Sequence, residues 1–437
     1  MENIIPSSGL SRRGFLGFAG AAATIPLLAA CAPAGSSTGP VDSNTVLKFW
    51  DMPWGAPKYS DTAADIVTSY SQSGMPTWSY QTIQWNNFYQ TFSSAIASNT
   101  GPAVSGGGGF QAFQFAELGK IAYADNLVET MKASGSYNDF LPGTIDSMKT
   151  ADGYVAMPWA MDLRVFWYKK SLLEQAGAEV PTDWDSLVTT GKALRKIGAS
   201  GFGIAGGSGY NHAPQAIITM MLNNNGGLFD ADGNLDCVTE RNIEAVEFVK
   251  ELVAENIIDP GMISYSMDNL ISQWAEDKVG FGIHEPGLAL NLGDTAGDVL
   301  VASPLTGPHG DQGTLMFINN IMMYTNSPSQ EASEAFLEYY LDNMITLWET
   351  DAVSRIPVRQ SIVDLPIFQE NEQFVKIVKE YQPISKSYAY PAEAGFAGLA
   401  AVDGGMQLWQ FAQTVLEGGT DAKASLESLS TELAKVL

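Results

Sequence analysis

Apolar and polar positions alternate along most of this chain with the periods of two kinds of element. Residues 46–50 and 78–83 have the pattern of β-strands, the second with a clear period of two, and residues 60–72 between them have a helical pattern. Strands and helices that follow one another in this way predict an α/β layered domain.

Three later helices are also predicted. Residues 182–185 have the spacing of a capping box and predict a helix that ends near Lys196. Residues 327–330 place a proline at the first helical position and predict a helix that ends near Leu341. Residues 241–253 carry apolar side chains along one helical face, as an amphipathic packing helix does.

The N-terminal segment has the features of an export signal. Arg12 and Arg13 precede an apolar stretch over residues 14–30, as in twin-arginine signals, and residues 28–31 resemble a lipobox whose Cys31 is lipidated. A membrane-spanning helix is the weaker alternative, because a span needs about 20 strongly apolar residues and this stretch is shorter and contains a proline.

The next segment separates the signal from the fold. Residues 32–44 are rich in Ala, Pro, Gly, Ser and Thr, which predicts a flexible tether. We therefore expect a signal over residues 1–31, a tether over residues 32–44, and a fold that begins near Thr45. The protein would then lie on the outer face of the cell membrane, held only by its lipid.

Length and charge narrow the class of protein. The roughly 390 residues beyond the tether exceed the number that one core usually supports, so two domains are expected. No second linker separates them, which predicts that the chain crosses between them more than once and leaves a cleft. The net charge of −25 would repel nucleic acid and anionic lipid, so neutral or cationic partners are expected.

The sequence has few motifs of enzymes or metal sites. The three histidines lie far apart, and Cys237 has no second cysteine at ligand spacing, so neither a metal nor another cofactor is expected. Residues 206–210 approach a nucleophile elbow, but Tyr210 stands where glycine is required. Residues 106–109, all glycine, predict either a loop that gives a ligand access to the backbone or a plain flexible turn.

Aromatic residues stand beside polar ones at several predicted strand ends. A sugar ring has apolar faces and a hydroxyl-rich edge, so its receptor needs flat aromatic surfaces beside carboxylate, amide and guanidinium groups. We assign Trp54, Trp85 and Trp159 to such a cleft. The clusters are residues 50–54, 84–87, 158–164 and 284–287. The tryptophans assigned to the core are Trp50, Trp78, Trp167 and Trp184.

Several short stretches, each loose by itself, follow one another in the order and spacing of a known family. They are residues 47–51 (Leu-Lys-Phe-Trp-Asp), 95–98 (Ala-Ile-Ala-Ser), 153–159 (Gly-Tyr-Val-Ala-Met-Pro-Trp), 167–170 (Trp-Tyr-Lys-Lys), 172–177 (Leu-Leu-Glu-Gln-Ala-Gly), 181–184 (Pro-Thr-Asp-Trp) and 416–420 (Leu-Glu-Gly-Gly-Thr). On these stretches, residues 45–437 resemble the family 1 extracellular solute-binding proteins of carbohydrate ABC importers, the maltose-binding-protein-like group. Residues 101–104 and 168–170 depart from the family pattern, so the resemblance leaves the ligand of this subgroup open.

The resemblance implies a fold as well as a class. It is a two-lobed, type II periplasmic-binding-protein-like α/β fold with several chain crossovers and the ligand cleft between the lobes. One lobe would comprise residues 45–157 and 323–354, and the other residues 158–322 and 355–437.

The resemblance also implies roles for particular residues. Asp162 matches a family carboxylate that accepts hydrogen bonds from sugar hydroxyls, and His284 and Glu285 stand where many relatives carry a Gly-Pro-Trp turn. Gln215 belongs to a segment that precedes a cleft-lining region. Together with the aromatic clusters, the candidate ligand-binding residues are Asp51, Trp54, Trp85, Asn86, Gly108, Phe110, Gln111, Trp159, Asp162, Arg164, Tyr210, His212, Glu285, Asn320 and Arg355.

The function that the resemblance implies is capture without chemistry. The lobes would close around a neutral oligosaccharide, and the permease of the importer would recognise the closed, monomeric protein. Two alternatives remain open from the sequence. The same scaffold would suit a peptide or a polyamine, and a surface glycosidase would use Asp162 and Glu285 as its carboxylate pair.

One substitution tests the implied site. We expect Asp162→Ala to weaken ligand binding at least ten-fold in calorimetry without lowering the stability of the fold. Unchanged affinity would remove Asp162 from the site.

Overall fold

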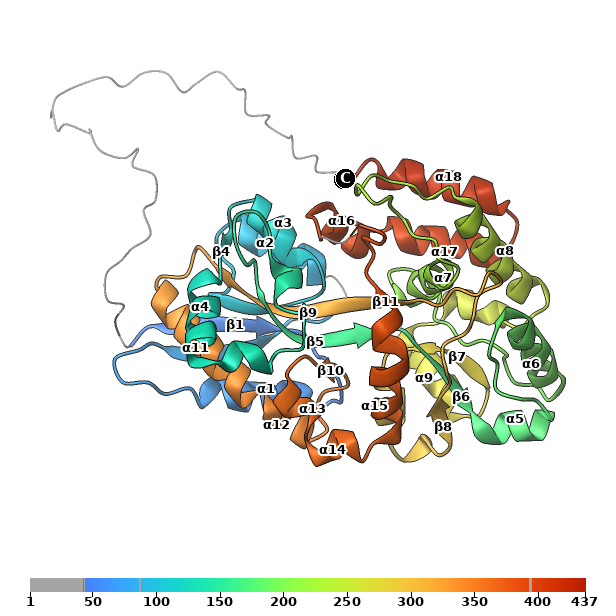
Figure 1. Cartoon of the computed structure of the whole chain (residues 1–437), viewed down its shortest axis with the longest axis horizontal. Coiled ribbons are helices and arrows are strands. Elements are labelled where there is room, and N and C mark those ends of the chain that lie inside the picture. Colours follow the sequence, from blue (N-terminus) through green and yellow to red (C-terminus); the bar gives the residue numbers. More distant parts are fainter. Residues whose placement is uncertain (1–41, 43, 86–87, 393–394) are drawn as a thin grey trace, which may run out of the picture. The chain divides into compact units, whose positions relative to one another are not determined.

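In the part of the chain that the structure describes, the β-strands form two sheets (Figure 1). The computed structural model describes residues 42, 44–85, 88–392 and 395–437. The strands are β1 (Val46–Asp51), β2 (Thr77–Thr82), β3 (Val104–Gly107), β4 (Ile121–Ala122), β5 (Met157–Leu163), β6 (Val165–Lys169), β7 (Phe281–His284), β8 (Val299–Val301), β9 (Thr314–Tyr324), β10 (Ile356–Pro357) and β11 (Ser385–Lys386). The larger sheet has the order β10-β5-β9-β3-β1-β2, with β4 and β11 also paired to β9, and the smaller sheet has the order β7-β6-β8.

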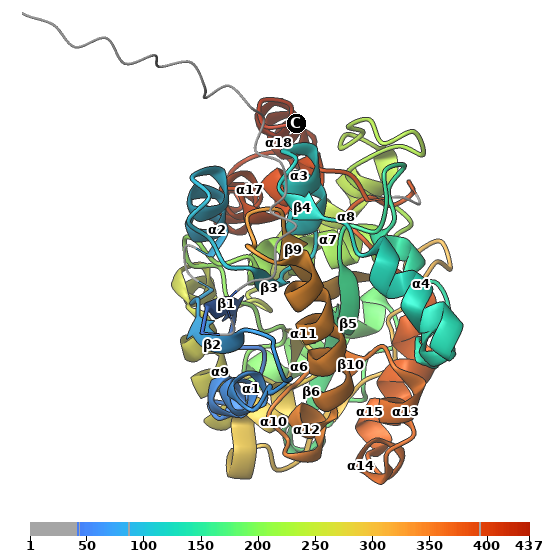
Figure 2. The same cartoon turned by 90° about the vertical axis from the view of Figure 1, so that its left-hand side faces the viewer.

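Helices pack around both sheets and fill most of the chain between the strands. They are α1 (Tyr59–Thr68), α2 (Phe88–Ala97), α3 (Gln111–Glu117), α4 (Asp125–Ser134), α5 (Lys170–Ala176), α6 (Trp184–Lys196), α7 (His212–Asn223), α8 (Glu240–Ala254), α9 (Met267–Ala275), α10 (Leu288–Leu292), α11 (Gln330–Asn343), α12 (Ile345–Glu349), α13 (Gln360–Val363), α14 (Pro366–Gln369), α15 (Glu372–Lys376), α16 (Gly398–Gly404), α17 (Gln407–Glu417) and α18 (Ala422–Leu433). Viewed from the side of the larger sheet, α1, α11 and α12 lie together, and each contacts the other two (Figure 2).

The chain passes from the larger sheet to the smaller one at a single residue. β5 pairs with β9 and β10 in the larger sheet, Arg164 follows, and β6 then pairs with β7 and β8 in the smaller sheet. The backbone of Arg164 is fixed there, because its N–H donates to the carbonyl of Leu315 and its own carbonyl accepts from the hydroxyl of Thr314. Side chains near Arg164 are therefore held where the two sheets meet.

The predicted α/β succession and its strands are confirmed, and the helix starts need small corrections. β1, α1 and β2 occupy the predicted places. The capping box of α6 is formed by Asp183 and Ser186, one residue later than predicted, because the carboxylate of Asp183 accepts from the Ser186 N–H. In α11 the hydroxyl of Ser329 provides the cap, so Pro328 precedes the helix instead of opening it.

The prediction of an open glycine loop is wrong for the first half of the run 106–109. Gly106 and Gly107 are the last residues of β3 and are buried in the larger sheet. A β-carbon at Gly106 would lie 2.3 Å from a carboxylate oxygen of Asp51, and one at Gly107 would lie 2.1 Å from the terminal methyl group of Met322 and 2.8 Å from the amide oxygen of Asn320. These glycines are needed because side chains of the neighbouring strands β1 and β9 lie against the backbone of β3.

The proposed signal and lipid attachment site, including Cys31, lie outside the described residues. Within the described part of the chain, no helix has both the length and the apolar character needed to cross a membrane.

The close contact at Gly106 gives a stability test. We expect Gly106→Ala to lower the free energy of unfolding by about 1–3 kcal/mol, because the added methyl group overpacks the contact with Asp51. The matched control is Gly419→Ala, where an added β-carbon would meet no atom within 4 Å. Urea unfolding of both variants measures the difference, and equal stability of the two would contradict the tight packing of β3.

Candidate functional site

Strand register brings the first pair of charged candidates together. β10 pairs with β5 so that Ile356 lies opposite Met161, which places Arg355 beside Asp162. The guanidinium Nε of Arg355 is 3.6 Å from a carboxylate oxygen of Asp162. Both side chains are buried, so neither charge is solvated by bulk water.

A second register adds two more charges to this pair. In the smaller sheet Val165 lies opposite His284, so Arg164 and Glu285 are placed side by side where the strands end. Arg164 donates to Asp162 at 2.8 Å, and Arg355 donates to Glu285 at 2.8 Å. We call these four residues, Asp162, Arg164, Glu285 and Arg355, the Arg355 cluster.

The Arg355 cluster fixes the charge of Glu285. Burial by itself would raise the pKa of Glu285, but the Arg355 guanidinium, with His284 and Arg164, outweighs it and holds that pKa well below its usual range. A carboxyl group that stays ionised cannot act as the general acid of a glycosidase. Glu285 is therefore unsuited to be the general acid of such a pair.

The cluster corrects the expectation that Asp162→Ala would leave stability unchanged. Asp162 neutralises two buried guanidinium groups, those of Arg164 and Arg355. Removing one partner of a buried ion pair leaves an uncompensated charge and typically costs about 3–5 kcal/mol. Loss of binding in that variant would therefore not separate a ligand contact from a structural role.

Asp51 lies in a second polar group at the end of β1. Its carboxylate accepts from the indole N–H of Trp54 at 2.7 Å and from the hydroxyl of Tyr59 at 2.8 Å. Burial raises the pKa of Asp51 to about 7, against the opposing effect of these two hydrogen bonds. Asp51 thus fixes the indole of Trp54 in place.

The three tryptophans assigned to the cleft form one contiguous array. Trp54 makes edge-to-face contacts with Trp85 and Trp159, at ring-centroid distances of 4.7 Å and 5.4 Å. Trp159 in turn lies 5.9 Å from Trp348. Trp54 and Trp159 are buried, whereas Trp85 is 36% exposed and is the member of the array that solvent reaches. The guanidinium carbon of Arg355 lies 6.0 Å from the Trp54 ring, which joins the array to the Arg355 cluster.

Aromatic side chains also surround the turn after β3. Gly109 has φ +49°, and its carbonyl accepts from the side-chain amide of Asn320. Phe110, Phe317 and Tyr388 are in mutual contact, with ring-centroid distances of 5.3–6.3 Å. We call these five residues the Gly109 cluster.

Arg164 connects the Gly109 cluster with the Arg355 cluster. Its guanidinium carbon lies 5.3 Å from the centroid of the Phe317 ring, and its Nε donates to the side-chain oxygen of Gln215 at 2.9 Å. Apolar ring surface and fixed charged groups are therefore adjacent. This is the combination that a ligand with apolar faces and hydroxyl groups requires.

Several buried polar atoms in this region have no hydrogen-bond partner among the described residues. They are both amide atoms of Gln111, both ring nitrogens of His284, Nδ2 of Asn319, Oδ1 of Asn320, Nε of Arg355 and the hydroxyl of Tyr388. Buried polar groups in folded proteins are rarely left unpaired. Other unpaired buried atoms lie elsewhere among the described residues, but these atoms belong to the segments that form the two clusters and are available to bind polar groups from outside the chain.

Three predicted residues have other surroundings. His212 accepts from the Ala205 N–H through Nδ1, and its Nε2 faces the carbonyl of Ile283 at 3.0 Å, so both ring nitrogens are engaged. Burial lowers the pKa of His212 to about 3, which keeps the ring neutral. Tyr210 is 40% exposed on the turn before α7, and Asn86 lies outside the described residues.

The tryptophans predicted for the core are buried, and the remaining glycine is loosely packed. Trp50, Trp78, Trp167 and Trp184 all have little exposure to solvent. A β-carbon at Gly108 would meet the rings of Trp85 and Phe88 at ordinary van der Waals distances of 3.5–3.6 Å.

Sequence reasoning missed Asp403, Phe317 and Tyr388. Phe317 lies opposite Asp162 in the pairing of β9 with β5, a register that no short motif encodes. Tyr388 and Asp403 come from the C-terminal third of the chain, where the sequence has no aromatic-polar cluster of the kind used to find the others. The sequence signal that could have pointed to Asp403 is its isolated carboxylate within a run of mostly small residues.

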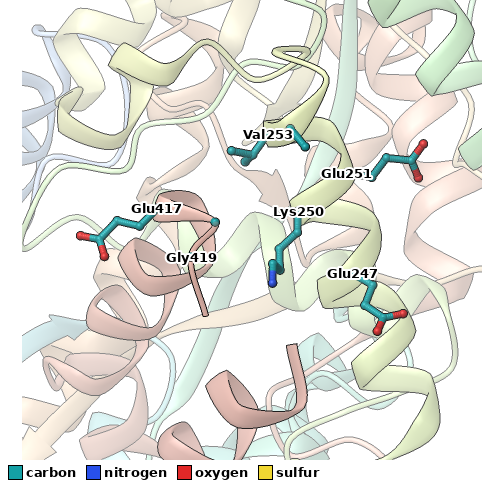
Figure 3. A pocket seen from close by; sticks show the side chains of 8 residues that line it. Glu247, Lys250, Glu251, Val253, Glu417 and Gly419 are labelled. Carbon is teal, nitrogen blue, oxygen red and sulfur yellow. The ribbon is translucent and has the colours of Figure 1, made fainter. Parts of the chain in front are cut away.

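The described residues include no group of three or more His, Cys, Asp or Glu side chains that could hold a metal ion. A cavity of about 640 Å³ lies apart from the two clusters, between α8 and the turn after α17 (Figure 3). Lys250 projects there and donates to the carbonyl of Thr420, and Glu247, Glu251 and Glu417 also line the cavity with their carboxylates pointing away from Lys250. None of these residues is a predicted site residue.

Two sheets joined at Arg164, with paired charges and aromatic rings where they meet, define a two-lobed binding protein of the periplasmic-binding-protein type. This confirms the predicted fold class. The chain belongs to the family of bacterial extracellular solute-binding proteins, whose model matches residues 71–345. This family binds solutes and does not convert them, which confirms the interpretation that the protein is not an enzyme.

Several known proteins are similar to this chain. A solved sugar transporter from Arthrobacter chlorophenolicus A6, with bound laminaribiose, is 54% identical with a TM-score of 0.87, and the match covers 90% of this chain and 99% of the other. The GacH receptor of Streptomyces glaucescens GLA.O is 22% identical with a TM-score of 0.75, over 90% and 98% of the two chains. A putative binding protein of Brucella abortus is 24% identical over 273 residues, which span 60% of this chain and 64% of the relative, less than two thirds of its length.

The raised pKa of Asp51 predicts a pH dependence of stability. The pKa is about 7 in the folded protein against 3.8 for a free carboxyl, so the unfolded chain ionises first and the wild-type protein loses stability as the pH rises from about 4 to about 7. Asp51→Asn cannot ionise. Its unfolding free energy relative to wild type should therefore rise over this range, by roughly 1.4 kcal/mol per pH unit at most. Urea unfolding at several pH values measures this, and a difference that stays constant with pH would contradict the raised pKa.

Proposed function

We propose that the protein is the solute-binding component of a carbohydrate ABC importer and that it captures a neutral oligosaccharide by closure of its two lobes. The observation that carries this proposal is the contact of Arg164 with both clusters, which sets apolar ring surface beside charged hydrogen-bonding groups. A flat sugar ring presents the complementary surface, with C–H faces for the rings and hydroxyl groups for the charges.

The charge balance supports a neutral ligand. In the Arg355 cluster two guanidinium groups, Arg164 and Arg355, are paired with two carboxylates, Asp162 and Glu285. Within this cluster no carboxylate is free of arginine to bind a polyamine, and no guanidinium group is free of carboxylate to bind an anionic sugar. Paired charges of this kind instead donate and accept hydrogen bonds with hydroxyl groups.

Similarity to the laminaribiose-bound transporter supports a more specific ligand. That protein is 54% identical to this chain over almost its whole length. We infer a β-linked glucose disaccharide, or a longer oligosaccharide of that kind, as the first ligand to test.

We further propose the two lobes that the sequence suggested, residues 45–157 with 323–354 and residues 158–322 with 355–437. The Arg355 cluster would lie at their boundary, since Arg355 opens the last segment and Asp162 lies near the start of the second. A ligand shifts an open–closed balance from 1:99 to 99:1 if it binds the closed form with about 5.5 kcal/mol greater affinity. Contacts from both lobes, available only in the closed form, would supply that difference, and the closed form would then engage the permease.

The expected location is the outer face of the cell membrane. We propose that Arg12 and Arg13 direct twin-arginine export and that lipidated Cys31 anchors the protein by its tether. The described cysteine, Cys237, is buried and free, so the described part of the fold does not depend on a disulfide. Such a fold can form before export, which suits export in the folded state.

Calorimetry tests the ligand class. We expect the purified protein to bind laminaribiose with a dissociation constant in the micromolar range or below, about −8 kcal/mol or better. We expect no heat of binding with spermidine or a tripeptide, and no loss of the disaccharide after long incubation. Binding only to spermidine or the peptide would overturn the proposal, and consumption of the sugar would make the protein an enzyme.

Fractionation of cells tests the anchor. We expect the wild-type protein in the membrane pellet with a labelled fatty acid, and Cys31→Ala without that label. Arg12→Lys combined with Arg13→Lys should retain the precursor inside the cell. A Cys31→Ala variant that still carries labelled fatty acid would contradict lipidation at Cys31.

A further inference from the structure

Asp403 is a partly exposed carboxylate whose side chain has no hydrogen-bond or ion-pair partner among the described residues. It lies near the end of α16. Its carboxylate oxygen Oδ2 would lie 3.7 Å from a β-carbon built on Gly109. Asp403 therefore faces the Gly109 cluster across the turn that follows β3.

The backbone around Asp403 is held firmly while its side chain is left free. The side-chain amide of Asn211 donates to the Asp403 carbonyl at 2.7 Å. The next residue, Gly404, lies so close to the ring of Tyr89 that a β-carbon there would approach to 2.6 Å. Asn211 is thus a positioning residue for the Asp403 carboxylate.

The charged and titratable groups that face Asp403 come from several elements. They are Asp162 on β5, Arg164 after β5 and Tyr388 after β11. Burial, with a further contribution from Asp162, raises the pKa of Asp403 to about 7, and the positive charge of Arg164 opposes the shift.

A second polar group, two residues after Gly109 in the sequence, supports the same ligand. Gln111, the first residue of α3, is 2% exposed, and neither its amide nitrogen nor its amide oxygen has a partner among the described residues. It follows Phe110, a member of the Gly109 cluster. Helices α3 and α16 are in contact, so Gln111 and Asp403 reach this region from segments almost 300 residues apart in the sequence.

We propose that Asp403 and Gln111 form a polar pair that binds hydroxyl groups of one sugar ring lying on the Gly109 cluster. Asp403 accepts a hydrogen bond from a hydroxyl, and the amide of Gln111 both donates to and accepts from its neighbour. The inference rests on the proposed function. It adds Asp403 as a residue that determines ligand specificity and gives Gln111, already a candidate from the sequence, a defined role beside it.

Substitutions of Asp403 and of Gln111 should have effects that a purely structural role of these residues would not give. Asp403→Asn should weaken laminaribiose binding at least ten-fold at about pH 8. Gln111→Leu has a similar volume and removes amide atoms that have no partner in the fold. It should therefore leave the melting temperature unchanged or raise it, while it weakens laminaribiose binding by a similar factor.

The pH dependence of binding distinguishes a ligand-binding role of Asp403 from a structural one. A carboxylate that accepts from a hydroxyl must be ionised, so the affinity of the wild-type protein should fall up to ten-fold per pH unit below about 7. In Asp403→Asn this fall in affinity below about pH 7 should be absent. The matched control is Asp232→Asn on an exposed turn, which should keep the wild-type affinity and profile.

The outcomes distinguish this inference from the proposed function. If wild type binds laminaribiose and both variants bind it equally well, the Asp403–Gln111 pair is wrong and the proposed function stands. If Gln111→Leu lowers the melting temperature as well as the affinity, Gln111 is structural. If wild type binds none of the neutral sugars, the proposed function itself fails.

Discussion

The meeting of the two sheets depends on one buried ion network. Arg355 contacts a carboxylate on β5 and another at the end of β7, so a single guanidinium links residues of both sheets. Buried charges are costly unless they are paired, and here each strand register supplies the partner that the next charge needs. The same network places Arg164 against Phe317, so the position of the candidate site follows from the way in which the sheets are joined.

Some polar groups of the clusters are held by protein partners, and others are left available for a ligand. Asp51, Asp162 and Glu285 have their oxygens engaged by protein donors, and they hold Trp54 and the two arginines in place. Gln111 and Asp403 have no such partners among the described residues and are carried on helices that are packed against each other. A binding site needs both kinds of group, because preorganised neighbours lower the entropy lost on binding and unpaired polar atoms gain most from the ligand.

The sequence was sufficient for the fold class and for part of the site. Alternation of strands and helices and the ordered family stretches placed β1, β2 and α8 correctly, and Asp162, Arg164, Glu285 and Arg355 do come together. Phe317 and Asp403 could not be predicted, because their places depend on strand register and on the contact of α3 with α16. The prediction of an open loop at the glycines of β3 was wrong for the same reason. Side chains from β1 and β9 lie so close to these positions that only glycine fits, and the sequence does not show those contacts.

The tryptophan array has an optical consequence. Trp85, Trp54, Trp159 and Trp348 follow one another at 4.7–5.9 Å, near enough for electronic excitation to pass between indoles, and the solvent-facing end of the array lies beside Gly108. Any rearrangement that alters the surroundings of Trp85 would change the emission colour or yield of the whole array. The protein therefore contains an intrinsic reporter of its own conformation, readable without a dye.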